Sequence, residues 1–211
     1  MINAIIAALG IAGILLASEF LWRIFNLRGE YARKFVHIVA GCYIAFLPFW
    51  VDYSLVMVLA VGFILANFIN RATNLFQAIH ATKRRSWGDM LLGISIFVVA
   101  AFGPEVWFFA AAILHVALAD GLAAIIGTKY GKIRYKFLDH GKSIVGSATF
   151  FVTSVFITGI TVIMAESLTV SAALLLLIVP TVTTLLENVS GYGTDNVTVP
   201  LSVLLLLSLF S

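Results

Sequence analysis

The chain has little charge and a single cysteine, and each shortage excludes a class of protein. Only 11% of its 211 residues are charged, whereas 62% are hydrophobic. Soluble domains are normally about a quarter charged and about half apolar. A soluble fold of this size would leave too much apolar area exposed to water. The lone Cys42 excludes an intrachain disulfide and a cysteine-based zinc site, and we expect it to be a small buried residue. The composition therefore predicts that lipid surrounds this protein.

Eight apolar segments have the length and spacing of membrane-spanning helices, which need roughly 20 apolar residues. The fourth and eighth are short, so the expected count is seven or eight. The first has no basic stretch before Arg23, which favours a retained helix over a signal peptide. No repeat or linker divides residues 1–211, so we predict one all-α domain, a polytopic transmembrane helical bundle. Its expected spans are about Ile2–Trp22, Phe35–Trp50, Ser54–Asn70, Met90–Phe102, Val106–Gly127, Ser143–Ala165, Leu168–Leu186 and Val197–Phe210.

The basic residues are confined to alternate connections between these segments. The connections after the first, third and fifth segments hold all 13 lysines and arginines, and the others hold none. Cytoplasmic loops of membrane proteins are enriched in basic residues. The loops at 23–34, 71–85 and 128–142 are therefore predicted to be cytoplasmic, with both termini on the far side. Because this topology explains the net charge of +3, we expect no nucleic-acid partner.

Asp120 is the strongest candidate for a functional residue. An ionisable side chain within the hydrocarbon is costly and usually functional, and Asp120 lies roughly 13 Å along a helix from the basic end at Lys129. The alternative is ordinary helix packing, with Asp120 paired to a basic residue. Small neighbours would let another helix or a ligand approach: Ala119, Gly121, Ala123, Ala124 and Gly127.

The stretch KFLDHGKSIVGS, Lys136–Ser147, imitates the end of a nucleotide-binding P-loop. The P-loop pattern needs a glycine where Lys136 stands, and we expect no strand before it. The following helix should begin near Ser143, and its unpaired amide groups favour a phosphate beside Lys142, Ser143 and Ser147. Gly146 would let a phosphate or a helix come close. An ordinary helix cap explains the same spacing equally well.

The stretch ENVSGYGTDNVTVP, Glu187–Pro200, carries two carboxylates and an amide beside a glycine-containing turn. Mg²⁺ prefers one or two carboxylates together with substrate phosphates. This favours a magnesium site on Glu187 and Asp195 beside Asn196, and a solvated turn is the alternative.

Two more polar features lie on or near the second and fifth segments. Glu30, Arg33, Lys34 and His37 share one helical face at the start of the second segment. They would hold a phosphate or anchor the helix at the headgroups. His115 is expected to be a packed polar residue that does not lie beside Asp120.

Taken together, these clusters resemble the polyprenol kinase family, which includes phytol kinase, dolichol kinase and the CTP-dependent diacylglycerol kinase. Four stretches match in order between about Ala32 and Pro200, and one departure is Ala119, where relatives often have glycine. The matching stretches are ARKFVHIVAG at 32–41, Ser86-Trp87-Gly88, DGLAAIIGTKYGK at 120–132 with KSIVGS at 142–147, and Glu187 with TDNVTVP at 194–200.

The resemblance implies transfer of the γ-phosphate of CTP to the hydroxyl of a membrane lipid alcohol at the cytoplasmic face. It implies Mg²⁺ held by Asp120, Glu187 and Asp195, with one carboxylate accepting the hydroxyl proton. The implied catalytic residues are Asp120, Lys142 and Asp195. The implied nucleotide-binding residues are Arg33, Lys34, His37, Lys132, Lys142, Ser143, Gly146, Ser147 and Asn196.

Three other classes of protein stay open at this point. CDP-diacylglycerol synthase has a similar Asp…Gly-Lys…Lys arrangement, so a phosphatidate cytidylyltransferase is the main alternative, although its longer C-terminal signature is missing. A transporter would need a polar path across the bilayer, whereas the charges gather at one face. A purely structural protein would leave Asp120 unexplained.

Overall fold

The computed structural model describes residues 2–25, 30–73, 87–137, 140–165 and 172–211, with side chains described outside 21–25, 30–33, 72, 137 and 140. Each of the eight apolar segments contains a helix, which confirms the predicted all-α bundle. The elements are α1 (Ile2–Phe25), α2 (Glu30–Ala45), the short 3₁₀ turn η1 (Leu47–Phe49), α3 (Tyr53–Thr73), α5 (Gly88–Ala101), α6 (Val106–Leu114), η2 (His115–Asp120), α7 (Gly121–Tyr130), strands β1 (Arg134–Phe137) and β2 (His140–Ser143), α8 (Ile144–Met164), α9 (Ala172–Val189) and α10 (Asp195–Leu209).

The helices have the lengths and the outward-facing side chains of a membrane protein. Large apolar side chains point away from the bundle, including Phe156 at 68%, Leu177 at 63% and Ile163 at 81% exposure. Such a surface is unfavourable in water and suits lipid. Within the described residues, five helical stretches are long and apolar enough to cross a membrane: Ile2–Phe20, Tyr53–Arg71, Val106–Tyr130, Ile144–Met164 and Ala172–Val189. Three shorter apolar helices are Lys34–Phe49, Gly88–Ala101 and Asp195–Leu209.

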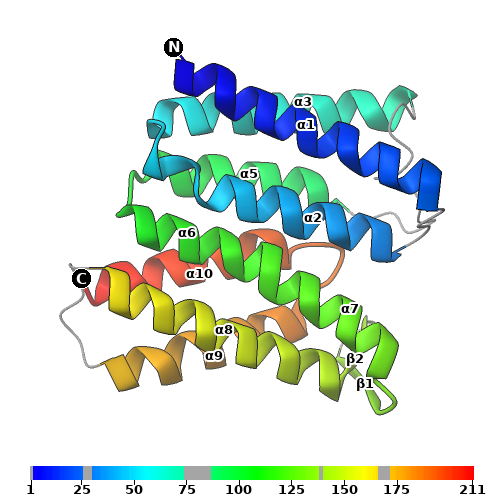
Figure 1. Cartoon of the computed structure of the whole chain (residues 1–211). Coiled ribbons are helices and arrows are strands. Elements are labelled where there is room, and N and C mark those ends of the chain that lie inside the picture. The colour runs from blue at the N-terminus through cyan, green and yellow to red at the C-terminus, as the bar shows by residue number, and fades with distance from the viewer. Residues whose placement is uncertain (1, 26–29, 74–86, 138–139, 166–171) are drawn as a thin grey trace.

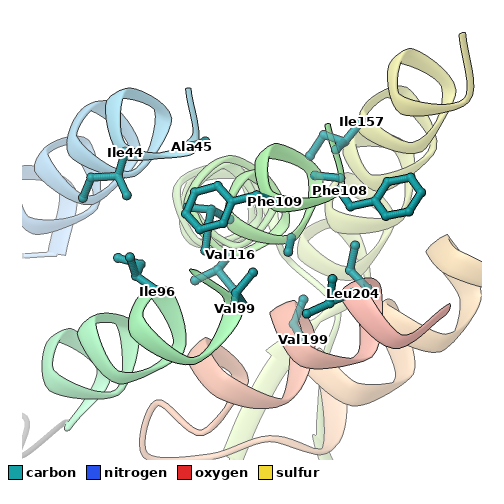
Figure 2. Packing of buried hydrophobic residues seen from close by; sticks show 14 of the residues in the cluster. Ile44, Ala45, Ile96, Val99, Phe108, Phe109, Val116, Ile157, Val199 and Leu204 are labelled. Atoms are coloured by element: carbon teal, nitrogen blue, oxygen red, sulfur yellow. The ribbon is translucent and has the colours of Figure 1, made fainter. Parts of the chain in front are cut away.

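The continuous run of α6, η2 and α7 forms the centre of the bundle. In its membrane-spanning stretch, Val106–Tyr130, 67% is buried inside the bundle, compared with 17–28% in the other four long stretches. Figure 2 shows Phe109 and Val116 of this run facing Ile96 and Val99 of α5, with neighbours from α2, α8 and α10 around them. The central run therefore fixes where the surrounding helices can place polar side chains.

The helices run side by side, and the two ends of the bundle differ (Figure 1). The N- and C-termini lie at one end, and the β1–β2 hairpin lies at the other, beside the last turn of α7. The hairpin is antiparallel, with Arg134 opposite Ser143 and Phe137 opposite His140.

The hairpin corrects the expectation that no strand precedes the Gly141-Lys142-Ser143 tripeptide. These three residues are themselves part of β2, which runs directly into α8. The tripeptide is thus in a strand rather than in a loop, and it does not form a P-loop. Strand β1, RYKF, alternates polar and aromatic residues over only four positions, and its partner β2, HGKS, contains no apolar residue, so the pattern was too short to predict a hairpin.

Candidate active site

α2 packs closely on the central helical run because glycines lie at the contact. A Cβ atom on Gly41 would lie 2.3 Å from Cβ of Ala117, and one on Gly121 would lie 2.3 Å from Cγ1 of Ile38. Real Cβ atoms essentially never come within 3.0 Å of a non-bonded atom from another part of the chain. The small residues around Asp120 therefore allow a close helix approach, and the approaching helix is α2.

This approach brings Lys34 of α2 to Asp120, and the two form a buried ion pair. Nζ of Lys34 donates to Oδ2 of Asp120, and each residue is 8% exposed. Pairing of Asp120 with a basic residue is the alternative to a functional role that the sequence left open. The ion pair with Lys34 also explains why a carboxylate is tolerated inside the bundle, because a buried charge needs an opposite charge or a hydrogen-bond donor.

Asp120 ends a π-helical turn, η2, that the sequence did not predict. Such turns are rare and occur frequently at functional sites, because the wider backbone turn changes which groups are hydrogen-bonded. Nε2 of His37 lies 3.1 Å from the carbonyl oxygen of Val116 in this turn. α2 is thus joined to η2 by His37 as well as by Lys34.

His115, at the start of η2, is a packed polar residue, as predicted. Its side chain is fully buried, with Nδ1 2.7 Å from the carbonyl oxygen of Ala111 and Nε2 2.8 Å from Oγ of Ser154. Oγ of Ser154 lies 3.2 Å from Oγ1 of Thr183. This chain of contacts joins the central run to α8 and α9.

A second ion pair joins β2 to the end of α9. Nζ of Lys142 donates to Oε1 of Glu187, whose side chain is 5% exposed. Burial by itself would lower the pKa of Lys142, but the Glu187 carboxylate outweighs burial, and the pKa of Lys142 is raised. The other oxygen of Glu187, Oε2, is buried and has no hydrogen-bond partner among the described residues.

Tyr135 of β1 links the hairpin to α8 and α9 by hydrogen bonds. Its hydroxyl lies 2.6 Å from Oγ of Ser147 and donates to Oδ1 of Asn188 at 2.8 Å. Ser147 also donates to Oδ1 of Asn188 at 2.7 Å. Sequence reasoning missed Tyr135 and Asn188, although Asn188 directly follows Glu187. Tyr135 gave no usable signal, since its role depends on the unexpected hairpin.

Ser143 and Gly146 shape the start of α8. Oγ of Ser143 accepts a hydrogen bond from the amide of Gly146 at 3.1 Å, an N-cap contact. A Cβ atom on Gly146 would lie 3.2 Å from the carbonyl oxygen of Ala123 and 3.5 Å from Cα of Gly127. The missing side chain of Gly146 therefore allows α7 to pack closely against the start of α8. A phosphate at this helix start stays a prediction.

The turn between α9 and α10, residues 190–194, together with the first residues of α10 forms an acidic loop that contacts the start of α5. The side-chain amide of Asn196 donates to the carbonyl oxygen of Gly88 at 2.7 Å, and the Trp87 amide donates to the carbonyl oxygen of Tyr192 at 3.3 Å. Tyr192 has a positive φ of 56° and Gly193 one of 91°, so the loop turns sharply before Asp195. Trp87 and Gly88 are thus adjacent to the acidic loop, although they lie far from it in sequence.

These contacts gather charged groups from four parts of the chain. Lys142 interacts electrostatically with Glu187, Asp195 and Asp120, and Asp195 also interacts with Lys34. The described residues contain no group of three or more His, Cys, Asp or Glu side chains arranged to hold a metal ion. The predicted ligands are therefore near one another without forming a closed metal cage.

Two predicted nucleotide-binding residues are not placed with this group. Lys132 is exposed beyond the end of α7, and the Arg33 side chain lies outside the described residues. One charged residue that the sequence reasoning overlooked is Asp89, in the first turn of α5, whose charge acts on His37. Its signal was its position, directly after the Ser86-Trp87-Gly88 stretch.

Comparisons with known proteins give two relatives. The chain is 30% identical over 204 residues to a phytol kinase of Synechocystis, covering 93% of this chain and 86% of that protein. It is 30% identical over 145 residues to an uncharacterized protein of Rickettsia prowazekii, covering 65% of this chain and 68% of that protein. No family model matches the chain, and no solved structure matches it. Because the match to the phytol kinase covers 93% of this chain at 30% identity, the chain belongs to the polyprenol and phytol kinase family.

Proposed function

We propose that this protein transfers the γ-phosphate of CTP to the hydroxyl of a membrane lipid alcohol: a polyprenol, phytol, dolichol or diacylglycerol. Family membership supports a lipid-alcohol kinase. The observation that carries the proposal is a group of two ion pairs near Asp195: the buried pair of Lys34 with Asp120, and the partly buried pair of Lys142 with Glu187. Phosphoryl transfer depends mainly on positioning and on neutralising charge, which such a group supplies.

The lysines suit the phosphates of the nucleotide. Lys142 lies in β2, two residues before α8 begins, where the positive end of the helix dipole adds to its charge. Lys34 reaches the same group of charges from α2. With Ser143, Arg33 and Asn196 they would orient the triphosphate so that its γ-phosphorus faces the lipid hydroxyl.

The carboxylates suit Mg²⁺. Oε2 of Glu187 is a buried, unpartnered hard oxygen among the described residues, which is the kind of donor that Mg²⁺ binds. Asp120 and Asp195 would add one oxygen each, and phosphate oxygens would complete the coordination. A closed three-carboxylate cage is not required, because Mg²⁺ is usually bound by one or two carboxylates and substrate. The bound ion would neutralise charge on the phosphates during transfer.

We place this site on the cytoplasmic side of the membrane. The basic loops at 23–34, 71–85 and 128–142 connect helix ends on one side of the predicted topology, and positive loops face the cytoplasm. The hairpin that carries Lys142 lies at the bundle end opposite both termini (Figure 1). The apolar tail of the alcohol would extend between the helices into the lipid.

The proposal is tested with purified protein in lipid nanodiscs. Polyprenol, phytol, dolichol, diacylglycerol and phosphatidate are offered separately, each with CTP or ATP and with Mg²⁺ or EDTA. We expect a phosphorylated lipid from at least one alcohol, dependent on Mg²⁺ and faster with CTP. If no alcohol is phosphorylated while phosphatidate yields a CDP-lipid, the protein is a cytidylyltransferase and the proposal is wrong.

A further inference from the structure

His37 lies one helical turn from Lys34, and only one of its two ring nitrogens contacts another described residue. Nε2 lies 3.1 Å from the carbonyl oxygen of Val116. A carbonyl oxygen only accepts hydrogen bonds, so Nε2 must carry the hydrogen. In a neutral ring Nδ1 then has a lone pair, and no residue that the structure describes is bonded to it. Val116 thus fixes the tautomer of the His37 ring.

His115 provides an internal contrast within the same bundle. Both of its ring nitrogens are occupied, by the Ala111 carbonyl oxygen and by Ser154, and its side chain is fully buried. The side chain of His37, in contrast, is only partly buried. Of these two histidines, only His37 can therefore accept a proton from a bound molecule.

The three carboxylates proposed above as Mg²⁺ ligands are poorly placed to accept a proton. Asp120 accepts from Lys34, Glu187 accepts from Lys142, and Oδ1 of Asp195 accepts from the amide of Asn196 at 3.1 Å. The remaining carboxylate oxygens are the ones assigned above to Mg²⁺. An oxygen that binds a cation is a weak proton acceptor, so a separate base is needed.

We propose that His37 is the general base of the reaction, an inference that rests on the proposed kinase function. As the lipid hydroxyl oxygen bonds to the γ-phosphorus, its proton passes to Nδ1 of His37. The bond between the γ-phosphorus and the β–γ bridging oxygen breaks, and the nucleoside diphosphate leaves with that electron pair. The resulting imidazolium, still bonded to Val116 through Nε2, returns its proton to water. This moves His37 from phosphate binding to proton transfer.

Two substitutions of His37 distinguish a role as general base from a purely structural contact with Val116. His37→Gln places an amide nitrogen near the position of Nε2, so it can still donate to Val116, but it has no basic nitrogen. His37→Ala removes both groups and leaves space for added imidazole. His115→Asn serves as the matched control, because it changes a histidine of the same bundle that contacts no reacting group. All are assayed in nanodiscs with CTP, Mg²⁺ and phytol, or with another alcohol that the wild type phosphorylates.

For a general base we expect kcat to fall by about 10²-fold or more in both His37 variants. Added imidazole should restore kcat of His37→Ala by roughly tenfold, and should leave His37→Gln unchanged. His115→Asn should stay within a few fold of wild type. If His37→Gln is nearly as active as wild type, His37 is a structural contact only. A wild type that phosphorylates no alcohol would overturn the kinase function itself, and the base role with it.

Discussion

Asp120 and Lys34 form a buried ion pair whose two members depend on each other. Removing one partner of a buried pair typically costs about 3–5 kcal/mol, because the other charge is left without compensation. A loss of activity after a single substitution would therefore mix a loss of folding with a loss of chemistry. A paired substitution separates the two effects.

We expect Asp120→Asn to lower both stability and activity, the activity by about 10²-fold or more, since it removes a charge that we propose binds Mg²⁺. The double variant Lys34→Met/Asp120→Asn should regain the thermal midpoint of wild type, because no unpaired charge remains. Its activity should stay as low as that of Asp120→Asn. Recovery of activity together with stability would show that Asp120 is only a structural partner of Lys34.

The Lys142–Glu187 pair should give a recognisable dependence of stability on pH. The pKa of Lys142 is raised above its ordinary value of 10.5, so the stability that Lys142 gains from the ionised Glu187 carboxylate is present up to pH 10.5 and is lost as the pH rises through the higher value. The difference in thermal midpoint between wild type and Lys142→Met should therefore be unchanged between about pH 9 and pH 10 and should shrink at higher pH. A difference that already shrinks between about pH 9 and pH 10 would contradict this pairing.

The contact between α2 and the central run is the element-level feature that assembles the site. It depends on Gly41 and Gly121, whose missing side chains let Lys34 and His37 reach η2. The hairpin positions Lys142 in a similar way, because Tyr135 bonds the hairpin to α8 and α9. The site therefore depends on the spacing of rigid elements as much as on its charged residues.

Gly41→Ala should push α2 away from the central run, since the new Cβ would lie 2.3 Å from Ala117. Overpacking of this kind typically costs about 1–3 kcal/mol, and we expect a lower thermal midpoint and a clear loss of activity. Gly13→Ala in α1 is the matched control, because nothing lies within 4 Å of the added Cβ. Equal effects of the two substitutions would argue that the α2 contact does not position the site.

At the level of the whole molecule, the topology places the hairpin and the termini at opposite ends (Figure 1). Single cysteines at Asp52 and Lys132, both exposed, in a Cys42→Ser background should be labelled from opposite sides of the membrane by an impermeant maleimide. Only the Lys132 position should react from the cytoplasmic side. Labelling of both positions from one side would overturn the assigned orientation.

The sequence predicted the helices well because lipid imposes long apolar stretches on any chain that crosses it. It also selected Asp120, Lys142 and Glu187, since charges are rare in such a chain. It did not predict which lysine pairs with which carboxylate, because Lys34 and Asp120 are 86 positions apart and meet only through helix packing. The π-helical turn and the hairpin were missed for the same reason: tertiary contacts stabilise them rather than a local pattern.

A protein that moves the γ-phosphate of a nucleotide onto a lipid hydroxyl must leave that phosphorus, and no other, in the lipid, and one measurement tests this directly. CTP carrying distinguishable labels at the α- and γ-phosphorus is incubated with the protein in nanodiscs that contain both phytol and phosphatidate. We expect the γ-label alone to enter lipid, in an amount equal to the CDP formed. Entry of the α-label into lipid, with the γ-label released in pyrophosphate, would contradict the claim.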